Sequence, residues 1–498
     1  MNVNPITRLD YPDLDVIRVE DTYYMVSTTM HFMPGCEILQ SFDLVHWEHV
    51  TYVYETLDHT DAQQLKSGQN IYGQGMWAAS LRYHEGRFCI CFVANDTRKT
   101  YLYTSEKIDG PWKKQLIEGF YHDGSLLFDE DGRNYIVYGN DEIWITELNE
   151  DLTAPKKDGL HRLLVSDHKN PELGYEGSHI QKINGYYYIF LIHSLRDRWM
   201  RTEACFYSDS LEGEFTGGDV LCDDRGYCGQ GVAQGGIVDT PDGKWYAMLF
   251  QDSGAVGRIP ILLPVTWKDH FPFFGQNGHV PEEIEVHSTR PGYIYQPLVG
   301  SDDFCNGLLP RWQFNHDPDP QYYHLDALQG TYTITTREVC TELTQAVNTL
   351  TQRMSYPSCA AEVTVDASAL KEGDVAGLCA LQSCYAAVGI TKHHGKYEVL
   401  MLDKKEDGIL DMTEGTVVES HQMDFRLEAD FCNMKDEARC YYRVNKGDWL
   451  PIGTVHKLYF KLDHFTGCRF GLFCYAAEET GGSACFRDFK YYDVDEIS

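Results

Sequence analysis

The stretch Gly185-Tyr186-Tyr187-Tyr188-Ile189-Phe190 joins a turn residue to an aromatic and β-branched run, and it recurs in looser form through the first half of the chain. The other copies begin with Gly or Asp in the same way: Asp21-Thr22-Tyr23-Tyr24-Met25-Val26, Gly86-Arg87-Phe88-Cys89-Ile90, Gly132-Arg133-Asn134-Tyr135-Ile136-Val137 and Gly243-Lys244-Trp245-Tyr246-Ala247-Met248. The turn residues are 65, 46, 53 and 58 residues apart, a spacing typical of propeller blades. Five copies therefore predict a five-bladed β-propeller.

The rest of the chain is also rich in strand signals, so the predicted fold class is all-β. The repeat stops near Trp267, and a new pattern of short alternating strands begins at Asp302. Regularly spaced strands of this kind favour a two-sheet sandwich. We expect a propeller over residues 1–296, a linker over 297–302 and a β-sandwich over 303–498.

Charge and composition exclude several classes of partner. The 498 residues carry 75 Asp and Glu against 42 Lys and Arg, a formal net charge of −33. Such a charge repels nucleic acid and anionic membranes, and no apolar run is long enough to span a bilayer. The segment Met1–Pro5 carries no secretory signal pattern, and the 16 Cys show no paired spacing typical of zinc sites. We therefore expect a cytoplasmic protein with reduced thiols.

The blade register brings five residues to equivalent positions. Counting back 8 or 9 residues from each turn gives Asp13, Ala78, Asp123, Glu176 and Gln234. The first strand of each propeller blade lines the central channel, so these side chains should converge. Three of them are carboxylic acids, and paired carboxylates flanking a cleft are what glycoside hydrolysis requires. We interpret Glu176 as the acid and Asp13 as its ionised partner, with Asp123 tuning or orienting the acid.

Short motifs in a fixed order resemble glycoside hydrolase family 43, the β-xylosidase and α-L-arabinofuranosidase family. The residues that carry the resemblance are Asn4-Pro5-Ile6, Tyr11-Pro12-Asp13, Arg18-Val19, Tyr23-Tyr24, Asp123-Gly124-Ser125-Leu126, Glu176-Gly177-Ser178-His179, and Gly257-Arg258 followed by Trp267. The stretch from Asp302 onward is similar to the concanavalin A-like β-sandwich attached to many of the β-xylosidases in that family.

The resemblance implies a five-bladed propeller that cleaves glycosides with inversion. It assigns Asp13 as general base, Asp123 as the residue that modulates and orients the acid, and Glu176 as general acid. Arg258 resembles the family arginine that binds sugar hydroxyls. The resemblance also places Phe32 and Trp77 among the aromatic residues that wall the pocket, where their rings would pack on a pentose.

Two departures from the family pattern leave questions open. Asp15 lies two residues after Asp13 on the same strand face, which makes it a rival base, although the register favours Asp13. Gln234 stands where many members have a histidine near the channel axis, in some cases beside calcium. We expect Gln234 to contact substrate and no cofactor to be required, with a calcium ion left open.

The leading interpretation is an exo-acting, inverting β-1,4-xylosidase that releases xylose from the non-reducing ends of xylo-oligosaccharides. An α-L-arabinofuranosidase, or an enzyme with both activities, is the alternative on the same fold. A propeller that binds carbohydrate without catalysis is the alternative from another class. The expected partner is an oligosaccharide substrate, and the sequence leaves open whether the protein forms a homo-oligomer.

Overall fold

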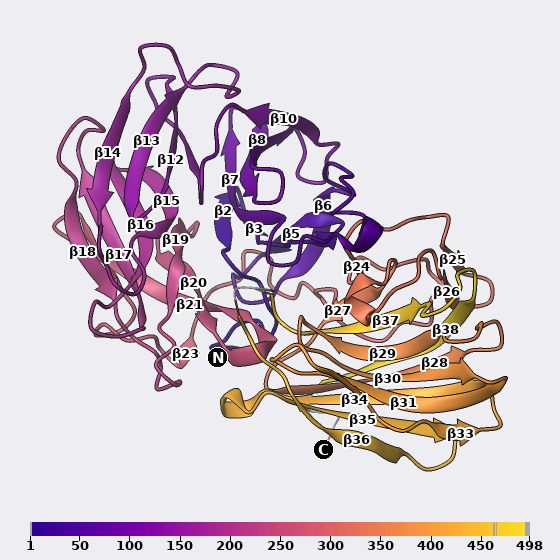
Figure 1. The fold of residues 1–498 in the computed structure, drawn as a ribbon. Coiled ribbons are helices and arrows are strands. Elements are labelled where there is room, and N and C mark those ends of the chain that lie inside the picture. The colour runs from indigo at the N-terminus through magenta and orange to yellow at the C-terminus, as the bar shows by residue number, and fades with distance from the viewer. Residues whose placement is uncertain (1, 462–463, 465, 494–498) are drawn as a thin grey trace.

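The computed structural model describes residues 2–461, 464 and 466–493 (Figure 1). Strands make up nearly all of its regular structure, which confirms the all-β fold class. The helices in this part of the chain are short 3-10 turns: η1 (Lys66–Gly68), η2 (Gly254–Val256), η3 (Leu343–Gln345) and η4 (Cys432–Met434). No helix within the described ranges has both the length and the apolar character needed to cross a membrane.

Five four-stranded antiparallel sheets form the propeller in the described chain (Figure 1). Blade 1 contains β2 (Asp15–Val19), β3 (Thr22–Val26), β5 (Gly35–Ser41) and β6 (Glu48–Tyr54), and blade 2 contains β7 (Met76–His84), β8 (Arg87–Ala94), β9 (Lys99–Ser105) and β10 (Lys113–Ile117). Blade 3 contains β11 (Ser125–Phe128), β12 (Asn134–Asn140), β13 (Glu142–Leu148) and β14 (His161–Ser166), and blade 4 contains β15 (Glu176–Ile183), β16 (Tyr186–Ser194), β17 (Arg201–Ser208) and β18 (Thr216–Leu221). Blade 5 contains β19 (Ala233–Asp239), β20 (Trp245–Asp252), β21 (Arg258–Lys268) and β22 (Phe271–Phe274). Each repeated turn residue of the sequence lies in the first hairpin of its blade, so the predicted five blades are confirmed.

Each blade packs against the next through the alternate faces of its strands. The apolar core between blades 1 and 2 includes Ile38 and Ile90, and the core between blades 5 and 1 includes Met25 and Leu262. The ring closes near the N-terminus, where β1 (Asn2–Val3) pairs with β23 (Glu283–Ile284). Because side chains alternate across a strand, one sheet can bury both faces against two neighbours.

Two large sheets form the sandwich, which lies beside the propeller in Figure 1. One contains β24 (Gln313–Asn315), β27 (Leu350–Arg353), β29 (Val375–Leu381), β30 (Ala386–His393), β31 (Lys396–Lys404), β32 (Leu410–Met412), β33 (Thr416–Val418) and β37 (Arg469–Tyr475), together with β4 (Phe32–Met33) of the propeller. The other contains β25 (Tyr323–Asp326), β26 (Thr331–Thr335), β28 (Ser358–Asp366), β34 (Gln422–Asp430), β35 (Glu437–Val444), β36 (Leu450–Lys457) and β38 (Ser483–Asp493). The segment 297–302, expected as a linker, contains no strand.

The propeller and the sandwich share both a sheet and a core. Strand β4 pairs with β24, with Phe32 opposite Asn315. Ala255, Val256 and Ile259 of the propeller belong to the main apolar core of the sandwich. The two parts are therefore continuous in packing and in backbone hydrogen bonding.

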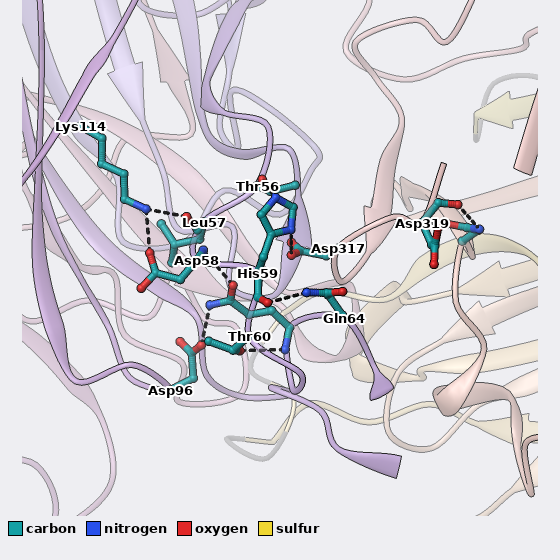
Figure 2. Close-up of polar contacts among 12 residues, drawn as sticks. Thr56, Leu57, Asp58, His59, Thr60, Gln64, Asp96, Lys114, Asp317 and Asp319 are labelled. Carbon is teal, nitrogen blue, oxygen red and sulfur yellow. Dashed lines mark hydrogen bonds and ion pairs between the residues drawn. The ribbon is translucent and has the colours of Figure 1, made fainter. Parts of the chain in front are cut away.

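A loop between β6 and β7 makes a polar contact with the sandwich (Figure 2). The imidazole Nδ1 of His59 lies 3.0 Å from a carboxylate oxygen of Asp317, and the amide of Asp317 donates to the carbonyl of Gln63 at 2.8 Å. Burial raises the pKa of Asp317 to about 6 although His59 lowers it. This pair fixes the loop against the second domain.

Arg353 of the sandwich contacts the propeller at Asp10 and Tyr11, in the segment that carries Asp13. Its Nε donates to the carbonyl of Asp10 at 2.9 Å, its Nη1 lies 2.8 Å from Glu37, and its guanidinium carbon lies 4.3 Å from the ring centre of Tyr11. All four side chains are buried. Although burial raises the pKa of Glu37, Arg353 and His49 lower it to about 2, so the pair is ionised at neutral pH.

We predict that Arg353→Met lowers the free energy of unfolding by about 3–5 kcal/mol, because Glu37 would keep a buried charge without its main partner. Chemical denaturation at pH 7 measures this. The matched control is Arg439→Met, which breaks a more exposed pair with Glu437 and should cost under about 1 kcal/mol. Equal effects of the two substitutions would contradict the assigned role of Arg353.

Candidate active site

A repeated backbone conformation brings the inner end of every blade to the propeller axis. Asp13, Ala78, Asp123, Gly177 and Gln234 all have left-handed φ values between 40° and 64°. These residues lie just before or inside the first strand of their blade. A left-handed residue turns the chain sharply, and it costs a non-glycine residue about 1–3 kcal/mol, so its recurrence in all five blades indicates a constraint that the inner strands share. All five line one small axial cavity.

This conformation corrects the register expected for Glu176. In blade 4 the left-handed position is taken by Gly177, and Glu176 lies one residue earlier. The matching residues before the left-handed position in blades 2 and 3 are Trp77 and His122. Asp13 and Asp123 also differ from expectation, because each lies two residues before its strand begins.

Asp13 is buried and held by two donors. Its Oδ1 is 2.5 Å from Nη1 of Arg258, and its Oδ2 accepts a hydrogen bond from the hydroxyl of Thr28 at 2.7 Å. The hydroxyl of Thr28 in turn accepts from the amide of Ala78 at 2.8 Å. Arg258 is only 3% exposed and also contacts Asp252. The arginine and the hydroxyl hold the Asp13 carboxyl group in a fixed orientation at the wall of the cavity, which suits a base that must be aimed at one reacting atom.

Asp123, His122 and Glu176 form a second, compact group. Nε2 of His122 lies 3.6 Å from Oδ2 of Asp123 and 3.6 Å from Oε2 of Glu176. The amide of Gly177 donates to Asp123 at 3.0 Å, and Nδ2 of Asn140 donates to Oε2 of Glu176 at 2.7 Å. The side chain of Glu176 is 22% exposed, whereas Asp123 is buried, so Glu176 has the better access to a ligand.

Burial and charge shift the titration of this group. Burial, with the nearby charges of Glu176 and Asp13, raises the pKa of Asp123 to about 6, although His122 lowers it. The charge of Asp123, followed by Glu176, raises the pKa of His122 to about 9 despite its burial. His122 is therefore a cation at neutral pH that lies between two carboxyl groups. Groups with displaced pKa values in a cleft are typical of acid–base sites.

Asp15, the rival base, lies in a different environment. It is 1% exposed, and its oxygens contact Nη1 of Arg82 at 2.7 Å, the amide of Leu81 at 2.8 Å and Nδ1 of His179 at 3.1 Å. Although burial raises its pKa, Arg82 and His179 lower it to about 2. These contacts join blades 1, 2 and 4 below the axial cavity. Asp15 is thus a structural carboxylate, and the geometry favours Asp13 as the base.

The two predicted aromatic residues have different surroundings. Trp77 is half-buried, and its ring centre lies 6.2 Å from that of His122. His122 in turn lies beside the carboxyl group of Glu176. Phe32 is fully buried at the domain joint, where the guanidinium carbon of Arg469 lies 3.5 Å from its ring centre and His31 packs on it. The prediction that Phe32 walls the pocket is wrong, because β4 pairs with the sandwich and directs this residue into the interface.

Gln234 lines the axial cavity, but the cavity does not fit calcium. The two carboxylates in its wall, Asp13 and Asp123, are already held by Arg258, Thr28 and Gly177. The remaining polar side chains there are an amide, an imidazole and the hydroxyls of two serines. Calcium takes six to eight oxygen ligands, so these donors do not suffice for a protein-held ion. We assign no step of the chemistry to a metal.

Sequence reasoning missed three residues that contact the acids. Thr28, His122 and Asn140 each bond or face one of the predicted catalytic carboxyl groups. His122 carried a signal, because it directly precedes Asp123 and occupies the same blade position as Glu176. Thr28 follows the second strand of blade 1 and reaches Asp13 of the same blade, whereas Asn140 ends the second strand of blade 3 and reaches Glu176 of blade 4.

Comparison with known proteins gives matches along the whole chain. The model of glycosyl hydrolases family 43 matches residues 3–272, and the model of the beta-xylosidase C-terminal concanavalin A-like domain matches residues 301–492. A beta-xylosidase from Formosa agariphila is 26% identical over 99% of this chain and 89% of its own length. A xylosidase/arabinosidase from Butyrivibrio fibrisolvens is 23% identical, with 99% of both chains covered.

Solved structures show the same arrangement. A bifunctional GH43-CE protein of Bacteroides eggerthii is 42% identical with a TM-score of 0.91 over 99% of this chain, which spans 63% of that longer protein. An engineered family 43 enzyme, described as having both endo-xylanase and exo-arabinofuranosidase activity, is 27% identical with a TM-score of 0.88, and 99% of both chains is covered. The chain thus belongs to glycoside hydrolase family 43, as a glycoside hydrolase with that family's propeller and C-terminal sandwich.

Proposed function

We propose that this enzyme is an exo-acting, inverting β-1,4-xylosidase that removes single xylose units from the non-reducing ends of xylo-oligosaccharides. The observation that carries the proposal is that two carboxyl groups from different blades lie at one end of the axis with different partners and different exposure. Asp13 is held by Arg258, whereas Glu176 lies beside Asn140 and His122 with part of its surface exposed. Relatives described as beta-xylosidases support the choice of sugar.

In the proposed reaction Asp13 takes a proton from a water molecule, and the water oxygen attacks the anomeric carbon. The glycosidic C–O bond breaks as Glu176 gives its proton to the departing oxygen. His122 lies beside both Asp123 and Glu176, and Arg258 holds the carboxyl group of Asp13 in place. Attack and departure take place on opposite faces of the sugar, so the released xylose has the inverted anomeric configuration.

Exo action is supported by the position of the sandwich. The ring centre of Phe460, from the sandwich, lies 6.0 Å from the guanidinium carbon of Arg258. The second domain therefore borders the site on the side of the base, which favours a recess that accepts a chain end. An α-L-arabinofuranosidase activity remains the second candidate, because relatives described as xylosidase/arabinosidases and as an α-L-arabinofuranosidase share this fold.

We predict that Glu176→Gln lowers kcat on xylobiose by about 10²–10⁴-fold, because the leaving oxygen loses its proton donor. An aryl xyloside with an acidic leaving group needs less protonation and should lose far less. Steady-state kinetics on both substrates measures the difference. The matched control is Glu172→Gln, an exposed carboxyl four residues upstream, which should leave both rates unchanged. Equal losses on the two substrates would show that Glu176 is not the acid.

The titration of Asp123 gives a second test. His122 is protonated below a pKa of about 9 and lowers the pKa of Asp123. We predict that His122→Asn raises the pKa of Asp123 above about 6, because the neutral amide no longer stabilises the Asp123 carboxylate. The pH dependence of the Asp123 side-chain carboxyl carbon-13 shift, measured by NMR, checks this, and a pKa that stays at about 6 or falls would contradict the assigned coupling.

A further inference from the structure

A second cavity lies beside the catalytic group, where the propeller meets the sandwich. It has a volume of about 410 Å³, and its wall includes Trp199, Arg201 and Asp252 of the propeller with Lys457, Tyr459 and Phe460 of the sandwich. The reaction described above uses none of these side chains directly. The cavity therefore needs an explanation of its own.

Asp252 connects this cavity to the catalytic base. Its Oδ1 lies 3.2 Å from Nε of Arg258, which binds Asp13, and its Oδ2 lies 2.6 Å from Nη1 of Arg201. Phe460 packs near the same Arg258 and also lines the cavity. A ligand in the cavity would thus lie one side chain away from Asp13. Such a place suits the part of a substrate beyond the sugar that is cleaved.

Arg201 gives the cavity its chemical character. It is only 7% exposed, and burial lowers its pKa. Within the described chain its Nε has no hydrogen-bond partner. Its guanidinium carbon lies 5.4 Å from the ring centre of Trp199 and 5.5 Å from that of Phe250. A guanidinium held between rings with unused donors matches the geometry of a carboxylate.

The remaining charges reinforce this preference. Asp252 is shared between two arginines, so it cannot neutralise both. The ammonium group of Lys457 donates to the carbonyls of Met434 and Lys435, which leaves its charge available to a ligand. Burial raises the pKa of Asp436, the other acid in the wall, to about 6, so this carboxyl group is mostly ionised at pH 7. The wall holds three cationic side chains, Arg201, Lys457 and Lys461, against these two acids, which leaves a small positive excess in a protein whose net charge is −33.

Trp199 adds the surface that a sugar needs. Its side chain is 44% exposed at the edge of the cavity, and an exposed indole of this kind packs on the face of a sugar ring. We propose that the cavity is a subsite for a carboxylate-bearing sugar, a hexuronic acid attached to the xylose next to the one released. This inference rests on the proposed function and adds the class of substrate: acidic, uronic-acid-branched xylo-oligosaccharides in preference to neutral ones.

Calorimetry on the Glu176→Gln variant tests the inference without turnover. The probes are xylotriose and a xylo-oligosaccharide of the same backbone with a hexuronic acid on the sugar after the terminal xylose. We expect the acidic probe to bind about tenfold more tightly, because its carboxylate would accept charge-assisted hydrogen bonds from Arg201. Adding Arg201→Met should abolish the preference, and adding Lys457→Gln should reduce it without disturbing Asp252. Lys405→Gln, an exposed lysine elsewhere on the sandwich, is the matched control and should retain it.

Two results would overturn the inference: equal binding of both probes, or a preference that survives Arg201→Met and Lys457→Gln. Its failure differs from a failure of the proposed function. If the wild-type enzyme releases xylose from xylotriose but the probes bind equally, only the subsite is wrong. If it releases no xylose from either probe, the proposed reaction is wrong, and the binding comparison still decides whether the cavity selects carboxylates.

Discussion

The left-handed residue at the inner end of each blade is the constraint on which the site depends. Its cost is offset by hydrogen bonds that run from one blade to the next. The amides of Ala78, Gly177 and Gln234 donate to Thr28, Asp123 and Glu203 of the preceding blade. Polar groups that would otherwise be buried without partners are thereby satisfied at the axis. The same bonds fix Asp13 and Asp123 in position, so the contacts that close the propeller also position these two carboxyl groups.

Charge then separates the roles of the acids. Asp13 faces an arginine, Asp123 is buried beside a histidinium, and Glu176 keeps access to a ligand. The three carboxyl groups therefore differ in their partners and in their exposure, as an acid, a base and an orienting residue should. The sandwich takes part through Arg353, which supports the segment before Asp13, and through Phe460 beside Arg258. The second domain therefore contacts the residues that hold Asp13 in position.

Much of this could be predicted from the repeat, and its failures have physical causes. Turn spacing located the blades and the three acids because each blade repeats one local pattern. It could not place Phe32, since Arg469 comes from a strand more than 400 residues away in the sequence. The turn spacing also placed Glu176 one residue away from its true position in the repeat, because Gly177 takes the left-handed position of blade 4. Asn140 was missed because its contact with Glu176 crosses between blades, and Thr28 because its contact with Asp13 depends on how the first hairpin of blade 1 folds back.

The stereochemistry of the first product tests the central claim most directly. Proton NMR during the first minutes of hydrolysis of an aryl β-xyloside, before mutarotation, reports the anomer released, because the leaving group is not itself a sugar. If Asp13 activates water while Glu176 protonates the leaving oxygen, α-xylose appears first and the β anomer grows in only as mutarotation proceeds. Initial release of β-xylose would mean that a carboxylate attacks the sugar itself, and it would contradict the roles assigned to Asp13 and Glu176.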